Sequence, residues 1–200
     1  YTTDGSEPTA TSPLYEKIVP VKEALTLKGA TFAYGRQMGK TLILPVRWNL
    51  ATAKPVLGTN PTEKLLTNGI RGSLKYSDFE WCSWADNDSV SFTIDLLKPE
   101  MLNTLTLGCI TNNGMAIHKP ASVRVEVSDD NSKFREAVVQ SFTSEEIFRE
   151  GNFIENLSLK LGGTQARYVR VTAKGPGVCP ASHVRPGQTS RVFFDEVMLE

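Results

Sequence analysis

The stretch Val123-Arg124-Val125-Glu126-Val127-Ser128 alternates an apolar side chain with a polar one at every step. Successive side chains of a β-strand point to opposite faces, so this alternation predicts a strand with one buried face and one face in water. Turn-forming clusters follow at 128–132 and 161–164. Short alternating strands between such turns predict an all-β fold, an antiparallel sandwich or jelly roll. The same pattern returns at 92–96, 105–109, 157–161 and 169–172.

Two stretches have the features of a helix. In 60–66, Asn60 is a good capping residue and Pro61 suits the first helical position, with Gly69 as a stop shortly after. This pattern predicts a helix of one or two turns. The stretch 144–148 predicts one more turn.

Charge and composition exclude two classes of partner. The 200 residues carry 22 Lys and Arg against 22 Asp and Glu, so the formal net charge is zero. A neutral chain has no field that would draw in nucleic acid or an anionic membrane surface. No apolar run reaches the roughly 18 residues of a membrane span, so we expect no membrane insertion. The sequence starts without a Met or a leader pattern, and the natural N-terminus is expected to lie upstream.

The three cysteines are expected to be buried thiols. Cys82, Cys109 and Cys179 are widely spaced and odd in number, and no CxxC pair indicates a zinc knuckle or a redox motif. At most one disulfide can form within the chain. A core of this size does not need one.

Catalytic motifs are absent. Gly35–Thr41 has one residue too few between its glycines for a phosphate loop and is predicted to be a hairpin turn. Adjacent carboxylates on a strand point to opposite faces, so they cannot share an acid–base site and are expected on solvated turns or strand edges. His118 and His183 show no metalloprotease spacing, and no GxSxG elbow is present. The carboxylate pairs lie at 129–130, 145–146 and 195–196.

A domain boundary is predicted near Trp48. Residues 1–48 hold a turn-rich head and strands around 25–27 and 42–44, which bury too little apolar surface to form a core alone. The longer strand series runs from Asn49 to Glu200. We therefore expect a partial domain at 1–48 and a main domain at 49–200.

The first segment resembles a known hairpin. Tyr1–Thr9, followed by Ser12-Pro13-Leu14-Tyr15, is similar to the chitobiase/β-hexosaminidase C-terminal domain, an immunoglobulin-like sandwich of bacterial glycosidases. In that family a strand precedes the tyrosine. The resemblance implies a partial immunoglobulin-like β-sandwich.

The second segment resembles the discoidin, or coagulation factor 5/8 type C, module, which serves as a galactose-type carbohydrate-binding domain. The resemblance implies an eight-stranded, galactose-binding-like jelly-roll β-sandwich with a shallow ligand surface at one loop end. Two departures, at Ala116–Pro120 and Arg191, replace tryptophans that are frequent in the family, so sugar specificity cannot be transferred. The matching stretches are 66–73, Trp81, 94–96, 125–130, 166–171 and 194–197.

The resemblance also implies a structural calcium ion. Asn68-Gly69 stands where the family usually has Asp-Gly, in a loop that often holds calcium. The implied ligands are oxygens of Asn68 and Ser73, with Glu196 closing the shell. Calcium accepts amide and carbonyl oxygens, so Asn68 can replace the usual Asp at lower affinity.

A sugar site needs an aromatic face for the apolar side of the ring and fixed polar groups for its hydroxyls. Three loops, at 74–88, 112–119 and 174–191, offer such side chains, while Trp81 is expected in the core. The candidate sugar-binding residues are Tyr76, Glu80, Trp84, Asn112, His118, His183 and Arg185.

Together these features predict a non-catalytic, carbohydrate-binding accessory region of a bacterial glycoside hydrolase of the chitobiase/β-N-acetylhexosaminidase type. Its expected partners are terminal galactose-type or N-acetylhexosamine residues of a glycan and an upstream catalytic domain of the same polypeptide. The expected location is secreted, periplasmic or at the cell surface. The alternative is a structural spacer without sugar affinity that packs against the catalytic domain; exposed aromatics at one loop end would favour sugar binding.

Overall fold

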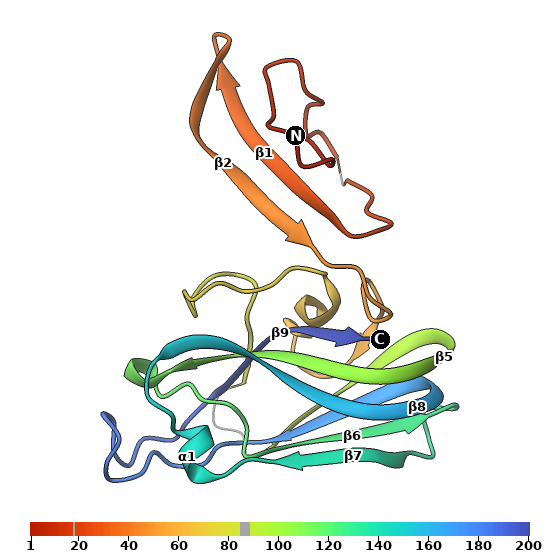
Figure 1. Cartoon of the computed structure of the whole chain (residues 1–200), viewed down its shortest axis with the longest axis vertical. Coiled ribbons are helices and arrows are strands. Elements are labelled where there is room, and N and C mark those ends of the chain that lie inside the picture. The colour runs from red at the N-terminus through yellow and green to blue at the C-terminus, as the bar shows by residue number, and fades with distance from the viewer. Residues whose placement is uncertain (18, 85–88) are drawn as a thin grey trace. The chain divides into compact units, whose positions relative to one another are not determined.

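The computed structural model describes residues 1–17, 19–84 and 89–200 of the chain (Figure 1). The described residues fall into two compact units, Tyr1–Trp48 and Asn49–Glu200. Each unit is built from antiparallel β-structure. No helix within the described residues is long and apolar enough to cross a membrane.

The first unit is a β-hairpin with a short N-terminal segment beside it. β1 (Leu25–Ala33) pairs with β2 (Arg36–Val46), and Thr2 and Asp4 form isolated bridges to β1. The turn residues Tyr34 and Gly35 have φ values of 51° and 72°, as the tight turns of twisted hairpins require. The expected hairpin turn at Gly35 is confirmed, and the rest of 35–41 continues into β2. Every residue of β1 and β2 is at least partly exposed, so this hairpin has no closed core.

The second unit is a two-layer β-sandwich. One layer contains β4, β9, the second half of β5 and the first half of β8; the other contains β3, the first half of β5, the second half of β8, β6 and β7. The strands are β3 (Val56–Leu57), β4 (Cys82–Trp84), β5 (Ser89–Asn112), β6 (Ser122–Ser128), β7 (Arg135–Ser141), β8 (Asn152–Lys174) and β9 (Val192–Leu199). The short helices are η1 (Glu63–Thr67), η2 (Asn113–Met115) and α1 (Ser144–Ile147).

β5 and β8 run side by side through both layers (Figure 1). Their register shifts between Asp95 and Glu100, where Leu97 has a φ of 70°, and the paired strands bend there from one layer to the other. The described residues of the second unit form a seven-stranded sheet. The resemblance implied eight strands; seven are found, and β5 and β8 each contribute one segment to either layer.

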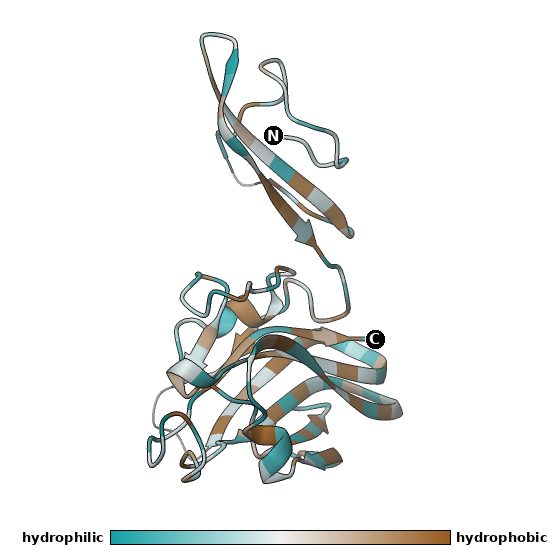
Figure 2. Ribbon diagram, turned by 60° about the vertical axis from the view of Figure 1, so that its left-hand side comes forward, coloured by the Kyte–Doolittle hydropathy of each residue, from teal (hydrophilic) through white to brown (hydrophobic). Residues whose placement is uncertain are grey.

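The predicted alternation holds along these strands. Phe92, Ile94 and Leu96 are buried from the first half of β5, and Leu105 and Leu107 from the second half. They meet between the layers in one apolar core. Figure 2 shows brown and teal residues alternating along the strands. The all-β, galactose-binding-like jelly-roll prediction is confirmed.

Of the two predicted helical stretches, one differs from the prediction and one agrees with it. The stretch at 60–66 does not form the expected helix from Pro61; it is the 3₁₀ helix η1, which begins at Glu63. The Asn60 side chain accepts the Thr62 N–H at 3.0 Å in a turn, and Thr62 makes no side-chain cap for η1. The helical turn predicted at 144–148 is confirmed as α1. It begins with a capping box in which Thr143 and Glu146 satisfy each other's backbone N–H groups.

The three cysteines are free and buried, as predicted. Burial raises the pKa of Cys82 to about 12. Burial also raises the pKa of Cys109. Both thiols are therefore protonated and unreactive at neutral pH.

Candidate functional site

β9 carries a β-bulge at Asp195 and Glu196. Leu107 pairs with Val197 and Cys109 with Phe194, so two residues of β9 lie opposite the single Gly108. A bulge turns successive side chains away from strict alternation. Both carboxylates therefore reach the same loop, at 69–72, and both are fully buried.

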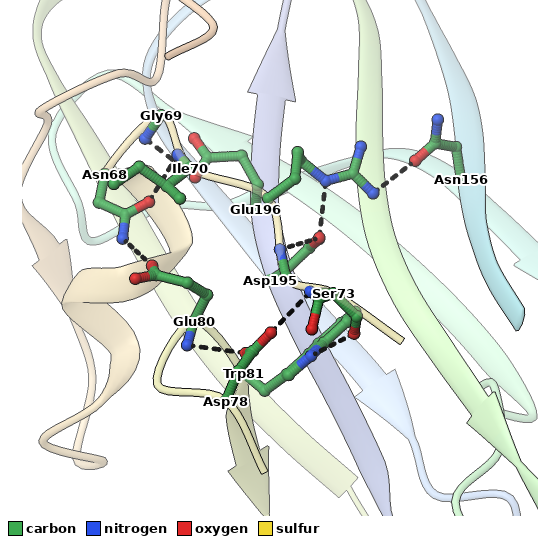
Figure 3. Close-up of polar contacts among 12 residues, drawn as sticks. Asn68, Gly69, Ile70, Ser73, Asp78, Glu80, Trp81, Asn156, Asp195 and Glu196 are labelled. Atoms are coloured by element: carbon green, nitrogen blue, oxygen red, sulfur yellow. Dashed lines mark hydrogen bonds and ion pairs between the residues drawn. The ribbon is translucent and has the colours of Figure 1, made fainter. Parts of the chain in front are cut away.

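Side chains of the bulge hold this loop against β9 through hydrogen bonds and an ion pair (Figure 3). The Gly72 N–H donates to Asp195 Oδ2 at 2.9 Å, and the Arg71 guanidinium donates to the same oxygen at 2.6 Å. The Gly69 N–H donates to Glu196 Oε2 at 3.1 Å. These contacts place Asp195 and Glu196 in a structural role. The expectation of a solvated strand edge at 195–196 is therefore wrong, because the bulge overrides the two-residue alternation.

The charges of the two carboxylates are set by burial. Burial raises the pKa of Asp195, although the Arg71 guanidinium acts in the opposite direction. Burial raises the pKa of Glu196 to about 9, and the Gly69 N–H only partly offsets this. Glu196 is thus protonated at neutral pH unless a cation faces it.

Two of the expected calcium ligands, Asn68 and Glu196, lie at this loop. Glu196 Oε1 is buried without a hydrogen-bond partner, and its other carboxylate oxygen accepts the N–H of Gly69, the residue that follows Asn68. The Asn68 side chain donates to Glu80 Oε2 at 2.8 Å and accepts the Ile70 N–H at 2.8 Å. Asn68 and Glu80 are joined by a hydrogen bond, and Glu196 is joined to the backbone of the next residue, Gly69. Amide and carboxylate oxygens of this kind suit calcium.

Ser73 does not join that set. Its N–H donates to Asp78 at 2.7 Å and its hydroxyl accepts the Lys75 N–H at 3.2 Å. Its carbonyl accepts the Trp81 indole N–H at 3.0 Å (Figure 3). The oxygen-bearing side chains that could hold calcium at this loop are therefore Asn68, Glu196 and Glu80, a predicted sugar contact, without Ser73; the ion itself stays a prediction.

Trp84 is part of the core and does not face solvent. It is 7% exposed and stacks on Phe92, with ring centroids 6.1 Å apart, and edge-on to Phe194 at 5.6 Å. Its prediction as a sugar contact is wrong, because β4 pairs with β9 and turns the indole between the layers. Residues 85–88 of the same predicted loop lie outside the described residues. Trp81 is buried, as expected.

Tyr76 and Asn112 have structural surroundings. Tyr76 is half-buried, and its ring meets Phe193 edge-on at 6.4 Å. Asn112 exchanges backbone hydrogen bonds with Ile117 at 2.8 and 3.1 Å, which closes the turn around η2.

The structure brings His118 and His183 together below the surface. Their Nε2 atoms are 3.1 Å apart, and both rings are buried. Burial, with a further contribution from His183, lowers the pKa of His118 to about 4, although the Ile147 backbone acts in the opposite direction. The pair is closed to a sugar in this structure, so the prediction of direct contacts from these two histidines is wrong. Arg185 is exposed and donates to Gln188 at 3.3 Å.

A shallow depression lies beside this pair. Its volume is about 410 Å³, within the range of small-ligand sites. Phe148 forms its apolar part and contacts His118 edge-on, with ring centroids 5.1 Å apart. The Arg149 guanidinium lies 4.0 Å from the Phe153 ring centroid. The lining residues are Ser144, Glu145, Phe148, Arg149, Glu150, Pro180 and Ser182.

Sequence reasoning missed this depression. The pattern at 144–148 predicts only a helical turn, and nothing in the sequence alone places it beside Pro180 and Ser182. A usable signal was present in the Phe148-Arg149 pair, an aromatic and a guanidinium directly after a helix in a polar loop.

A two-layer β-sandwich with a ligand-sized depression at one loop end is the architecture of a β-sandwich binding module. The family model of the F5/8 type C domain matches residues 51–184. The chain belongs to the F5/8 type C domain family. The model of the chitobiase/β-hexosaminidase C-terminal domain matches residues 1–42.

Solved structures with a similar fold include three modules of bacterial proteins. CpGH89CBM32-6 of Clostridium perfringens is 18% identical, with a TM-score of 0.49 over 76% of this chain and 98% of its own. A fucose binding module, SpX-3, of Streptococcus pneumoniae is 17% identical, with a TM-score of 0.46 over 76% of this chain and 97% of its own. The C-terminal domain of a chitobiase of Bacteroides fragilis is 16% identical, with a TM-score of 0.41 over 68% of this chain and 78% of its own. The search of curated proteins gave no match.

Proposed function

We propose that residues 49–200 form a non-catalytic carbohydrate-binding module that holds a terminal galactose-type or N-acetylhexosamine residue in the depression around Phe148. The observation that carries this proposal is the composition of the depression. One aromatic ring lies among carboxylates, a guanidinium and hydroxyls at a loop end. Membership of the F5/8 type C family supports the proposal.

The side chains of the depression suit a sugar ring. The half-buried Phe148 offers an apolar surface to the C–H groups of the ring. Glu145 and Glu150 accept hydrogen bonds from hydroxyls, and Arg149 donates to ring or hydroxyl oxygens. Ser144 and Ser182 do both. This set can orient one hexose without any catalytic group.

The expected affinity is weak. A hexose has about twelve heavy atoms, and at roughly 0.3 kcal/mol per atom its binding free energy is on the order of 4 kcal/mol. This corresponds to a dissociation constant near millimolar. Retention on a polysaccharide then depends on several modules or on a tethered enzyme.

The test is a titration of galactose, N-acetylgalactosamine and N-acetylglucosamine followed by NMR shifts. We compare the wild type with Phe148→Ala and with Phe134→Ala, a half-buried aromatic that stacks on Arg170 at the far end of β7. Saturable binding that is lost in Phe148→Ala and kept in Phe134→Ala supports the proposal. No response to any of the three sugars at tens of millimolar favours the spacer function instead.

The match of residues 1–42 to the chitobiase/β-hexosaminidase C-terminal domain supports a parent glycoside hydrolase of the β-N-acetylhexosaminidase type. We propose that its catalytic domain lies upstream in the same polypeptide and that the protein works outside the cytoplasm. The purified chain should then fail to hydrolyse nitrophenyl galactoside and nitrophenyl N-acetylglucosaminide above a heat-treated control. Turnover by the chain would contradict the assignment.

The proposal includes a structural calcium ion at the 68–72 loop. Asn68, Glu80 and Glu196 would hold it through oxygen atoms, and it would supply positive charge beside the buried carboxylates. Its expected effect is on stability, since the loop lies on β9 and outside the depression.

A further inference from the structure

His118, Cys179 and His183 gather at the loop end of the sandwich, and the proposed function does not use them. Among the described residues they form the one group of three metal-ligating side chains whose ligand atoms all lie within 4.8 Å of one another. All three are buried: His118 is 0% exposed, Cys179 3% and His183 8%.

Backbone hydrogen bonds hold the two loops that carry the cluster. The His118 N–H donates to the Arg191 carbonyl, and the Arg191 N–H donates to the Ala116 carbonyl, both at 3.0 Å. Within the second loop, the Cys179 N–H donates to Gln188 at 2.9 Å and the His183 N–H donates to Pro180 at 3.0 Å. The cluster is therefore held in place by main-chain contacts as well as by its own side chains.

The hydrogen bonds fix the protons on both rings. The Arg185 N–H donates to His183 Nδ1 at 3.0 Å, so the proton of neutral His183 is on Nε2. That proton points to His118 Nε2, 3.1 Å away, which must accept it. His118 consequently has its proton on Nδ1 and a lone pair on Nε2, directed into the cluster. This is the tautomer that a metal bound at Nε2 requires.

We propose that His118 Nε2, His183 Nε2 and Cys179 Sγ bind a divalent transition-metal ion, with zinc as the preferred ion. Imidazole nitrogens and a thiolate bind zinc in preference to calcium or magnesium, which take oxygen ligands. Two nitrogens at about 2.0–2.1 Å from a tetrahedral zinc lie roughly 3.3 Å apart, close to the separation found here. In a tetrahedral site with a Zn–S bond of about 2.3 Å, the sulfur lies roughly 3.6 Å from each nitrogen, so Cys179 Sγ has to approach by about 1.2 Å at most.

Binding moves two protons. The Cys179 thiol releases its proton to solvent and becomes a thiolate. The His183 proton leaves Nε2 and a proton is taken up at Nδ1, so the ring stays neutral. Nδ1 then no longer accepts the Arg185 N–H, and the 183–187 turn has to release that hydrogen bond. One proton is lost to solvent for each ion bound.

Two groups can supply the fourth ligand of the metal. The Ser190 hydroxyl is buried and lies 3.3 Å from Cys179 Sγ. Alternatively, a water molecule from the depression can be the fourth ligand, because Pro180 and Ser182 line the depression and belong to the loop that carries Cys179 and His183. Either gives a four-coordinate site with three protein ligands from the cluster.

The test uses the full chain, freed of metal by chelator and dialysis, and titrated with Co²⁺ as a spectroscopic probe and then with Zn²⁺. We expect saturation at one equivalent, a near-ultraviolet thiolate-to-cobalt absorption band, visible bands of a tetrahedral site and displacement by zinc. Zinc binding should release one proton per ion. Calcium at the 68–72 loop gives no thiolate band, so the two sites are distinguished.

Cys179→Ala should weaken zinc binding at least about 100-fold and remove the thiolate band. Cys82→Ala removes another buried thiol that lies outside the cluster, so this control should change neither the zinc affinity nor the thiolate band. Should Cys179→Ala fail to fold, His183→Gln provides a second ligand deletion with the same expected loss. The proposal is overturned if the wild type gives no saturable thiolate band, or if a folded ligand deletion binds zinc as the wild type does.

Discussion

Arg71 Nε lies 2.6 Å from Asp195 Oδ2, and this carboxylate has no exposed surface. The pair joins the 69–72 loop to the bulge of β9 across 124 positions of sequence. The guanidinium is also held by Asn156 on β8 at 2.9 Å. A loop and two strands thus meet at one ion pair.

Asp195→Asn should destabilise the module by about 2 kcal/mol, because the Arg71 guanidinium keeps its desolvated position but loses the charge it faces. The free energy of unfolding in urea measures this. Glu136→Gln is the matched control: it removes the carboxylate that lies 3.5 Å from Arg124, a pair in which both side chains are more than half exposed. Its effect should stay below about 1 kcal/mol. Equal effects of the two substitutions would contradict a special role for the buried pair.

Gly108→Ala should be poorly tolerated. A Cβ at this position would lie 1.9 Å from Asp195 Oδ1 and 2.5 Å from Arg71 Nη2, so the ion pair would have to move. We expect a loss of about 1–3 kcal/mol in unfolding free energy. Gly114→Ala places a Cβ 3.4 Å from Asn112 Oδ1, an ordinary contact, and should change stability by less than about 0.5 kcal/mol. A Gly108→Ala variant as stable as Gly114→Ala would show that the bulge relaxes freely.

Asp95 should contribute stability that depends on pH. Arg167 donates to both of its carboxylate oxygens, at 2.8 and 2.9 Å, and this pairing lowers the pKa of Asp95 below its ordinary value of 3.8. A lowered pKa stabilises the folded state above the ordinary value, and the contribution disappears as the pH falls through the folded value. Asp95→Asn should therefore cost less than about 1 kcal/mol at pH 7, since Arg167 is 37% exposed.

The stability gap between the wild type and Asp95→Asn should then close in acid. Asp95 also accepts the Leu97 N–H at 2.8 Å at the strand bend, and the amide oxygen of the variant can still accept it, so the substitution isolates the ion pair. Urea denaturation at several pH values from 7 down to 2 provides the measurement. A gap of constant size over the whole range would assign the effect to packing.

Calcium should raise the melting temperature, and chelator should lower it. Asn68 lacks the charge of the usual aspartate, so we expect binding in the millimolar range that is typical of extracellular modules. Asn68→Asp should strengthen binding, and Glu196→Gln should remove the response to calcium. Identical melting curves with calcium and with chelator for both the wild type and Asn68→Asp would exclude an ion at this loop.

Strands could be predicted from the sequence because they depend on local alternation. The alternation at 123–128 can be recognised from the side chains of that stretch alone, and the stretch forms β6 in the structure. The 195–196 bulge could not be predicted in this way. It depends on the pairing of β9 with Gly108 in β5, a partner that no local pattern identifies.

The candidate site was harder to predict for the same reason. Trp84 is of a residue type that often contacts sugars, but the direction of its side chain is set by the pairing of β4 with β9. The depression combines the loop after α1 with Pro180 and Ser182, which come together only in the folded module. The sequence predicts His118 and His183 only as sugar contacts on two loops, because their mutual contact depends on those loops meeting.

The continuous path of β5 and β8 through both layers also constrains the order of folding. Neither layer can be completed alone, because each contains one half of the same strand pair. The residues of this pair closest in sequence are Asn112 and Asn152, so closing the chain there costs the least entropy. Pairing can then extend through the bend towards Ser89 and Lys174. A module dominated by such long-range pairs should fold slowly, and stopped-flow refolding should show one main phase in the range of milliseconds to seconds.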